Sequence, residues 1–156
     1  MNQLKDTNET IYKLIGSCME VHRTLGPGFE VETYKKALEI EFKEKEFKFE
    51  ADKSFDVVYK DNLIATLKVD FIVNESVIMA IRCQNELKDT EIQQVLRALP
   101  MTNTGIGLLV NFGNTKIQYK RILPSRQARN DVRKDQLVGV AAYREMGKTR
   151  EANPII

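Results

Sequence analysis

The apolar residues of this chain change their spacing near Glu46, and this change constrains the fold more than any other feature of the sequence. Before it, apolar residues recur at three- and four-residue intervals over residues 7–25 and 30–45, which predicts two amphipathic helices. After it, apolar residues alternate between Phe47 and Tyr59, which is typical of a strand with one buried face. Two helices followed by strands within 156 residues predict one α/β domain.

Cap and turn residues mark the ends of the two predicted helices. Asp6 or Thr7 is expected to cap the first helix, which runs to about Leu25. The segment Gly26-Pro27-Gly28 is expected to end it, because glycine suits the left-handed cap and proline cannot continue a helix. The outer face of the second helix, predicted to be solvated, carries Lys35, Lys36, Glu39, Lys43 and Glu46.

Strand signals dominate the rest of the chain, with one helix between them. Short turns join the three predicted strands up to Cys83, which predicts an antiparallel meander. A helix capped by Asp89 or Thr90 is expected to follow. The apolar run at 106–110 predicts a buried central strand. These further elements are predicted at residues 47–59, 63–73, 77–83, 89–99, 106–110 and 116–123. The predicted order ααβββαββ is that of a mixed β-sheet flanked by helices.

Composition excludes several classes of protein. Hydrophobic residues make up 42% of the chain and charged residues 29%, a balance in which disorder is not expected. No apolar run reaches about 18 residues, so no membrane-spanning helix is expected, and the polar first ten residues predict no signal peptide. Cys18, Cys83 and His22 are too few for a usual zinc site, and two free thiols predict a cytoplasmic protein.

Basic residues are concentrated near the carboxyl end, although the net charge is only +2. The stretch 116–134 contains seven basic residues and one acidic residue, which predicts either a phosphate-binding surface for nucleic acid or a solvated basic tail. Apolar periodicity fades beyond Pro124, so residues 124–156 are expected to form a basic tail or one peripheral helix. The basic residues are Lys116, Lys120, Arg121, Arg126, Arg129, Arg133 and Lys134.

Three polar side chains within apolar segments are the candidates for chemistry. Asp70 lies between Val69 and Phe71 on a predicted strand, where a buried charge is unfavourable. Its presence there indicates either a functional role or a position that faces solvent. Arg82 on the following strand is expected to form an ion pair with Asp70. Gln94 on the next helix either reaches the same region or lies on the helix surface.

Several segments together resemble a known family. The segment Val21-His22-Arg23-Thr24-Leu25-Gly26-Pro27-Gly28-Phe29, followed by Tyr34, resembles the opening of the GxxExxY proteins, which belong to the PD-(D/E)XK nuclease superfamily. The resemblance continues through 69–73, 91–96 and 107–113 and covers about residues 8–123. It implies a PD-(D/E)XK nuclease-like mixed β-sheet flanked by helices, in agreement with the order ααβββαββ.

The resemblance also implies an active site. In that superfamily the site holds an acidic residue on the first core helix, an aspartate on the second core strand, and Glu-x-Lys on the third strand. A glutamine and a tyrosine four residues apart follow on the next helix. The carboxylates hold Mg²⁺ or Mn²⁺, which binds the scissile phosphate and its attacking water, and the lysine orients or helps deprotonate that water.

This chain keeps only part of that site. The aspartate and the glutamine correspond to Asp70 and Gln94. The positions of the helix glutamate, of Glu and Lys in Glu-x-Lys, and of the tyrosine hold Val31, Ala80, Arg82 and Ala98. Asp70 with the Ile81 carbonyl would hold a metal only weakly, and Arg82 stays protonated and cannot act as a base. An alanine introduced by mutagenesis would explain Ala80 but not the other three departures.

These departures predict a catalytically inactive nuclease-like module, spanning residues 7–123, that binds DNA, RNA or a partner protein without a cofactor. The alternative is a Mg²⁺- or Mn²⁺-dependent nuclease with a rearranged active site. A third interpretation is an interaction domain with no role in nucleic-acid binding, such as a homodimer. The replacement metal ligands in a rearranged site would come from Glu30, Glu32, Glu86 or Glu91.

Overall fold

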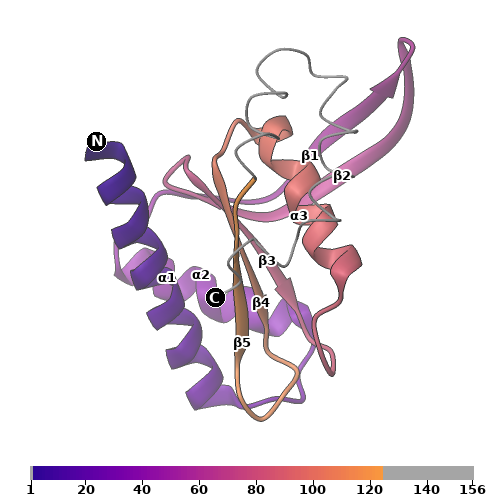
Figure 1. The fold of residues 1–156 in the computed structure, drawn as a ribbon. Helices are drawn as coiled ribbons and strands as arrows, with labels where there is room; N and C mark the ends of the chain where they lie inside the picture. The colour runs from indigo at the N-terminus through magenta and orange to yellow at the C-terminus, as the bar shows by residue number, and fades with distance from the viewer. Residues whose placement is uncertain (1, 125–156) are drawn as a thin grey trace.

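A five-stranded sheet lies between helices in the computed structural model, which describes residues 2–124 (Figure 1). The elements follow the predicted order ααβββαββ, which confirms the predicted fold class. They are α1 (Asn2–Leu25), α2 (Val31–Glu44), β1 (Phe49–Tyr59), β2 (Asn62–Val73), β3 (Val77–Arg82), α3 (Asp89–Thr102), β4 (Ile106–Asn111) and β5 (Gln118–Ile122). Of the predicted tail, residues 125–156 lie outside the described residues.

The sheet is mixed, with the strand order β1-β2-β3-β4-β5. β1, β2 and β3 pair antiparallel, which confirms the predicted meander. β3 and β4 pair in parallel, and β4 and β5 pair antiparallel. Parallel neighbours need a crossover connection, and α3 provides it between β3 and β4. β4 lies between two strands, as its apolar run predicts.

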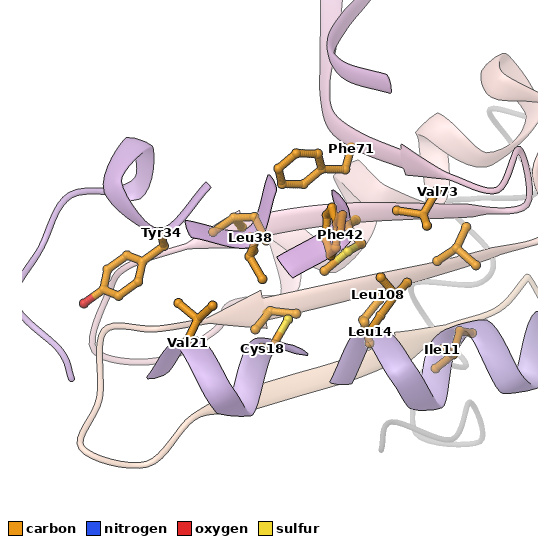
Figure 2. Close-up of a cluster of buried hydrophobic side chains, with 14 of the residues drawn as sticks. Ile11, Leu14, Cys18, Val21, Tyr34, Leu38, Phe42, Phe71, Val73 and Leu108 are labelled. Atoms are coloured by element: carbon orange, nitrogen blue, oxygen red, sulfur yellow. The ribbon is translucent and has the colours of Figure 1, made fainter. Parts of the chain in front are cut away.

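Different helices cover the two faces of the sheet. α1 and α2 cover one face, where Leu14 and Phe42 pack in the same cluster as Phe71 of β2 (Figure 2). α3 covers the other face, where Val95 packs in a second cluster with Leu109 of β4. Because both faces are covered, β3 and β4 are buried along almost their whole length, which explains their continuous apolar runs.

The glycine-proline-glycine segment joins α1 to α2 and is held by a tyrosine. Gly26 has a φ of 71° and its N–H donates to His22 O at 2.7 Å, so it ends α1 as predicted. The hydroxyl of Tyr34 donates to Gly26 O and accepts from the N–H of Phe29 at 3.3 Å. Figure 2 shows this hydroxyl pointing away from the apolar cluster, while the ring stacks on Phe112 with 4.6 Å between centroids. Tyr34 therefore has a structural role.

Two of the predicted helix starts are wrong. α1 begins at Asn2, and Asp6 and Thr7 lie inside it; Asp6 O accepts a hydrogen bond from the hydroxyl of Thr10 at 2.9 Å, as a helix interior allows. α3 begins after Lys88 rather than being capped by Asp89 or Thr90. The Glu91 carboxylate accepts from the Lys88 N–H at 2.7 Å and so satisfies a donor at that helix start. Among residues 2–124, no helix is long and apolar enough to cross a membrane.

β1 and β2 form a hairpin that projects beyond the rest of the sheet (Figure 1). β2 pairs with β3 only over Phe71–Val73, whereas its pairing with β1 continues out to Asn62 opposite Tyr59. Among the strands of residues 2–124, none lies as a third strand beside the outer part of the hairpin. Its exposed apolar side chains are Val58, Tyr59, Leu63 and Ile64.

Candidate functional site

Asp70 lies on β2 at the point where regular pairing with β3 ends. The β2–β3 ladder stops at the pair Phe71–Met79. Beyond it, the backbone N–H of Ile81 donates to Asp70 Oδ2 at 2.8 Å, so the carboxylate takes the place of a backbone acceptor. The Asp70 side chain is 15% exposed, and at that burial its charge requires partners.

The guanidinium of Arg82 on β3 contacts both Asp70 and the neighbouring carbonyl. Nη1 donates to Ile81 O at 2.9 Å and lies 3.5 Å from Asp70 Oδ2. Nη2 donates to Gln94 Oε1 at 3.2 Å, and Nε lies 3.2 Å from Glu91 Oε2. The predicted ion pair between Asp70 and Arg82 is confirmed, and Gln94 reaches the same region from α3.

A lysine predicted to lie on a solvated helix face is buried in this site. Lys35 of α2 is 1% exposed; its Nζ lies 3.3 Å from Asp70 Oδ1 and donates to Asp52 on β1. The prediction is wrong because Lys35 belongs to the apolar stripe of α2, four residues after Val31 and three before Leu38. That spacing is the sequence signal that places Lys35 on the inner face.

The contact between Lys35 and Asp52 shifts the pKa values of both groups. Burial by itself lowers the pKa of Lys35, but the hydrogen bond to Asp52 and the charge of Asp70 outweigh burial and raise that pKa above its ordinary value. The hydrogen bond from Lys35 lowers the pKa of Asp52, and the charges of Lys35 and Lys68 lower it further. Both groups are therefore charged at neutral pH and form an ion pair.

Asp52 is the member of this site that sequence reasoning missed. It interrupts β1 with a left-handed backbone, φ 56°, which aspartate tolerates better than most residues. Its carboxylate contacts Lys35 and lies 3.5 Å from Lys68 Nζ. The available signal is the break in apolar alternation between Phe49 and Phe55, but that break does not identify a partner on a helix.

A hollow of about 90 Å³ lies beside Asp70 and Arg82. Its lining includes Ala80 of β3 and Ala98 of α3. These alanines stand where the resemblance implies the glutamate of Glu-x-Lys and the tyrosine of the next helix. Their short side chains supply neither a carboxylate nor a hydroxyl to this space. Val31, at the position of the helix glutamate, is partly buried and packs against the core under α1 and α2.

The donor atoms of this site do not fit a divalent metal ion. Mg²⁺ and Mn²⁺ bind carboxylate, carbonyl and water oxygens. Asp70 Oδ1 faces Lys35, however, and Oδ2 is held by the Ile81 N–H and by Arg82. Within residues 2–124, no group of three or more His, Cys, Asp or Glu side chains is placed to hold a metal ion. Asp70 here is the partner of two side-chain cations.

Two of the four carboxylates considered as replacement metal ligands do lie in the site, and both face cations. Glu32 Oε2 lies 3.6 Å from Lys35 Nζ. Glu91 Oε2 lies 3.2 Å from Arg82 Nε. The other two candidates, both exposed, are Glu30 and Glu86. Glu32, Asp52 and Asp70 thus converge on Lys35 Nζ, and the ammonium group occupies the point where these carboxylates meet.

The predicted basic block lies only partly within the described residues. Lys116 is exposed and precedes β5, and Lys120 and Arg121 are successive residues of β5. Their β4 partners, Leu109 and Leu108, belong to the cores on opposite faces of the sheet, so the two basic side chains point to opposite faces. Nucleic-acid binding by this block stays a prediction. The members outside the described residues are Arg126, Arg129, Arg133 and Lys134.

Comparisons with known proteins agree with this fold. In a comparison with solved structures, the chain is similar to the crystal structure of SSO0001, with a TM-score of 0.52 and 15% identity. The similarity covers 79% of this chain and 59% of that one, so this chain spans less than two thirds of its length, and at this identity the likeness supports the fold alone. No curated protein sequence matches. The family model of the PD-(D/E)XK nuclease superfamily matches residues 8–122, well over half of the sequence, and the chain therefore belongs to that superfamily.

Proposed function

We propose that this chain is a catalytically degenerate PD-(D/E)XK domain of the GxxExxY type that binds nucleic acid without cleaving it. The observation that carries the proposal is the place of Arg82 Nη1. This nitrogen contacts Ile81 O at 2.9 Å and Asp70 Oδ2 at 3.5 Å, the two oxygens that the sequence offers to a metal ion. The guanidinium between these oxygens supplies the positive charge that a metal ion would otherwise supply there. It leaves neither oxygen free to bind a metal.

The chemistry of the remaining side chains supports the same conclusion. The guanidinium of Arg82 stays protonated, so it cannot accept a proton from an attacking water. Ala80 offers no ligand, and Lys35 holds the second oxygen of Asp70 at 3.3 Å. Each group that metal-dependent hydrolysis requires is therefore missing or engaged, whereas the superfamily fold is kept.

A cleavage assay tests the loss of activity. The full chain would be incubated near neutral pH with DNA and RNA substrates and with Mg²⁺ or Mn²⁺. We expect no more cleavage than with the Asp70→Asn variant, which serves as the background control. Metal-dependent cleavage by the unmodified chain that disappears in Asp70→Asn would contradict the proposal.

Restoring the Glu-x-Lys motif tests the role of the guanidinium. Ala80→Glu combined with Arg82→Lys adds a second carboxylate beside Asp70 and removes the planar cation that covers the oxygens. We expect calorimetry to detect Mn²⁺ binding to the double variant and not to the unmodified chain. Arg82→Lys alone is the matched control, because it alters the cation without adding a carboxylate. Equal Mn²⁺ affinity in all three proteins would show that Arg82 does not stand in the place of a metal.

Nucleic-acid binding is tested by its dependence on salt. If the predicted basic block contacts phosphates, affinity is independent of base sequence, and log K falls with log salt by about 0.9 per contact on duplex DNA. Fluorescence anisotropy with a labelled duplex at several salt concentrations measures this slope. Neutralising Arg126, Arg129, Arg133 and Lys134 together should flatten it by about two units or more, while Asp70→Asn should leave it unchanged. No binding at low salt would leave a protein partner as the ligand.

A metal-dependent nuclease with a rearranged site is the second candidate, and the position of Lys35 favours it. Its Nζ lies 3.3 Å from Asp70 Oδ1, so α2 brings a lysine beside the aspartate although β3 lacks one. On this alternative, the cleavage assay gives metal-dependent activity that Lys35→Met and Asp70→Asn both abolish. Lys36→Met, on the exposed side of α2, is the matched control and should retain that activity.

A partner protein or a second copy of the chain is the third candidate, and the projecting hairpin favours it. Its exposed apolar side chains include Leu63, 63% exposed, and Ile64, 61% exposed. Leu63 pairs with Val58 of β1, so these two exposed side chains share one face of the hairpin, while Ile64 lies on the other face. Exposed apolar side chains gathered on one face are typical of interaction surfaces. On this alternative, the chain sediments as a dimer and Leu63→Ser with Ile64→Ser returns it to a monomer. A monomer at all concentrations contradicts self-association.

A further inference from the structure

Two cavities meet at the end of the sheet where β5 finishes. The smaller one, of about 440 Å³, is lined by Leu123 and by the loop between α3 and β4. The larger one, of about 670 Å³, extends along α1 to residues 45–47, which follow α2. Thr7 of α1, with Glu75 and Ser76 of the turn between β2 and β3, lines both cavities. The two cavities are therefore continuous and form one groove.

The larger cavity has an excess of negative charge. Its lining contains four exposed carboxylates, and no lysine or arginine of residues 2–124 forms an ion pair with any of them. Lys45 also lines it, but its Nζ lies 3.4 Å from Glu41 Oε1 and donates to Ser17 Oγ at 2.6 Å. That leaves Lys13 as the one other cation of this lining. The carboxylates are those of Asp6, Glu9, Glu46 and Glu75.

Arg121 lines only the smaller cavity. Its Nε has no hydrogen-bond partner within residues 2–124, but this atom is buried and is not reached from the cavity. The groove therefore offers a ligand more accessible negative than positive charge, and a cationic ligand suits it best.

The last described residue lies beside this groove, and a basic stretch follows it in the sequence. Leu123 lines the groove, Pro124 comes next, and residues 126–134 carry four basic residues against one acidic residue, Asp131. The larger cavity follows α1 from Asp6 to Lys13, about 11 Å at 1.5 Å per residue. Nine residues at about 3.3 Å each can span that distance. A tether this short also keeps the stretch near the groove at an effective concentration of the order of mM.

We propose that residues 126–134 of the same chain occupy this groove, with their basic side chains paired to its carboxylates. Charge complementarity favours this occupant over a nucleic acid, because the carboxylates repel phosphates. The tether favours it over a separate basic peptide. The docking itself does not rest on the proposed function, but one consequence does. The same cations are predicted to contact phosphates, so a duplex has to displace them from the groove and binds with a lower apparent affinity.

A nitroxide spin label at residue 130 reports where the stretch lies. The label is attached to the full chain carrying Asn130→Cys and Cys83→Ser, since the other thiol, that of Cys18, is buried. The measurement is the broadening of backbone amide signals in ¹H–¹⁵N NMR spectra of this protein. A mixture of spin-labelled chain with ¹⁵N-enriched chain lacking the spin label detects contacts between copies.

We expect broadening at Glu75 and Gly105, which line the groove, and not at Asp61, which lies at the far end of β2. The broadening should vanish near 1 M salt, where the Debye length is about 3 Å. No broadening, equal broadening at Glu75 and Asp61, or broadening that this salt does not change overturns the proposal. Broadening of the ¹⁵N-enriched chain in the mixture also overturns it, because the occupant is then a second copy.

Matched charge removals identify the segment that docks. Combining Arg126→Gln, Arg129→Gln and Arg133→Gln should abolish the broadening, because the ion pairs are lost. The matched control removes the same charge further along the chain and should leave the broadening unchanged. An equal effect of the two sets contradicts the assignment to residues 126–134. The control substitutions are Arg144→Gln, Lys148→Gln and Arg150→Gln.

The consequence for nucleic acid is measured separately, by fluorescence anisotropy with a labelled duplex. Glu9→Gln with Glu75→Gln should tighten binding about fivefold, because the basic residues are released from the groove. Asp61→Asn with Glu86→Gln removes the same charge at exposed positions outside the groove lining and should change the affinity by less than about twofold. Equal tightening in both pairs contradicts the competition. Absence of all duplex binding overturns the proposed function instead, while the spin-label result still decides whether the stretch docks.

Discussion

Arg82 and Arg121 lie on the same sheet, on β3 and β5, and have opposite surroundings. The guanidinium of Arg82 contacts oxygens of four other residues at 2.9–3.5 Å. Arg121 Nε is buried and has no hydrogen-bond partner. A cation whose donors are all engaged contributes to stability and closes its site to other ligands. A cation with a buried, unpaired donor lowers stability. The following predictions test this contrast, from the largest effect to the smallest.

Asp70→Ala should produce the largest loss of stability. It removes the carboxylate shared by Lys35 and Arg82 and leaves the buried Lys35 with fewer compensating charges. We expect the free energy of unfolding, measured by urea denaturation, to fall by about 3 kcal/mol. The control Glu86→Ala, at an exposed position, should change it by less than about 0.5 kcal/mol. A similarly small change for Asp70→Ala would show that the ion pairs do not stabilise the fold.

Lys35→Met should have the next largest effect. It leaves Asp52 and Asp70 without their shared cation, but both carboxylates retain some access to water, which reduces the cost. We expect the free energy of unfolding to fall by about 2 kcal/mol in the same denaturation experiment. Lys36→Met, one residue away on the exposed side of α2, should be close to neutral. If the two variants are equally stable, the buried ion pairs of Lys35 do not contribute to the free energy of unfolding.

Matched substitutions of the two arginines test the comparison directly. Arg82→Met should lower the free energy of unfolding by about 1 kcal/mol, because Asp70 keeps its bonds to Lys35 and the Ile81 N–H. Arg121→Met should raise it by about 1 kcal/mol, because a buried unpaired donor disappears. Changes of the same sign in both variants would mean that the two arginines do not differ as described.

The smallest expected effect is a dependence of stability on pH that arises from the titration of Asp52 and Lys35. The folded-state pKa of Asp52 lies below the ordinary value of an aspartate, so its contribution to stability is present above that ordinary value and is lost as pH falls through the folded pKa. The folded-state pKa of Lys35 lies above 10.5, so its contribution is present below that pH and is lost as pH rises through the folded pKa. Denaturation midpoints should therefore stay level between these limits, as far as this pair is concerned. Asp52→Asn should show a shallower loss below pH 4 than the unmodified chain.

The element order was predictable because helical and strand periodicity are local properties of the sequence. Gly26 ends α1 for a local reason too, since a left-handed residue followed by proline cannot continue a helix. The helix starts were less predictable. Asp6 and Asp89 have the side chains of N-caps, but α1 begins at Asn2, and at the start of α3 the Glu91 carboxylate accepts from the Lys88 N–H.

The sequence by itself determined the order ααβββαββ and the pairing of Asp70 with Arg82. That pair was predictable because a short turn joins β2 to β3 and brings them side by side. Only the tertiary structure decided that Lys35 meets Asp52 and Asp70, and that Arg121 lines a cavity with its Nε unpaired. Those arrangements depend on how α2 packs on the sheet and on which face each β5 residue occupies. The spacing of Lys35 on α2 indicates its inner face, but strand register and helix packing decide which residues it meets there, through contacts between residues far apart in the chain.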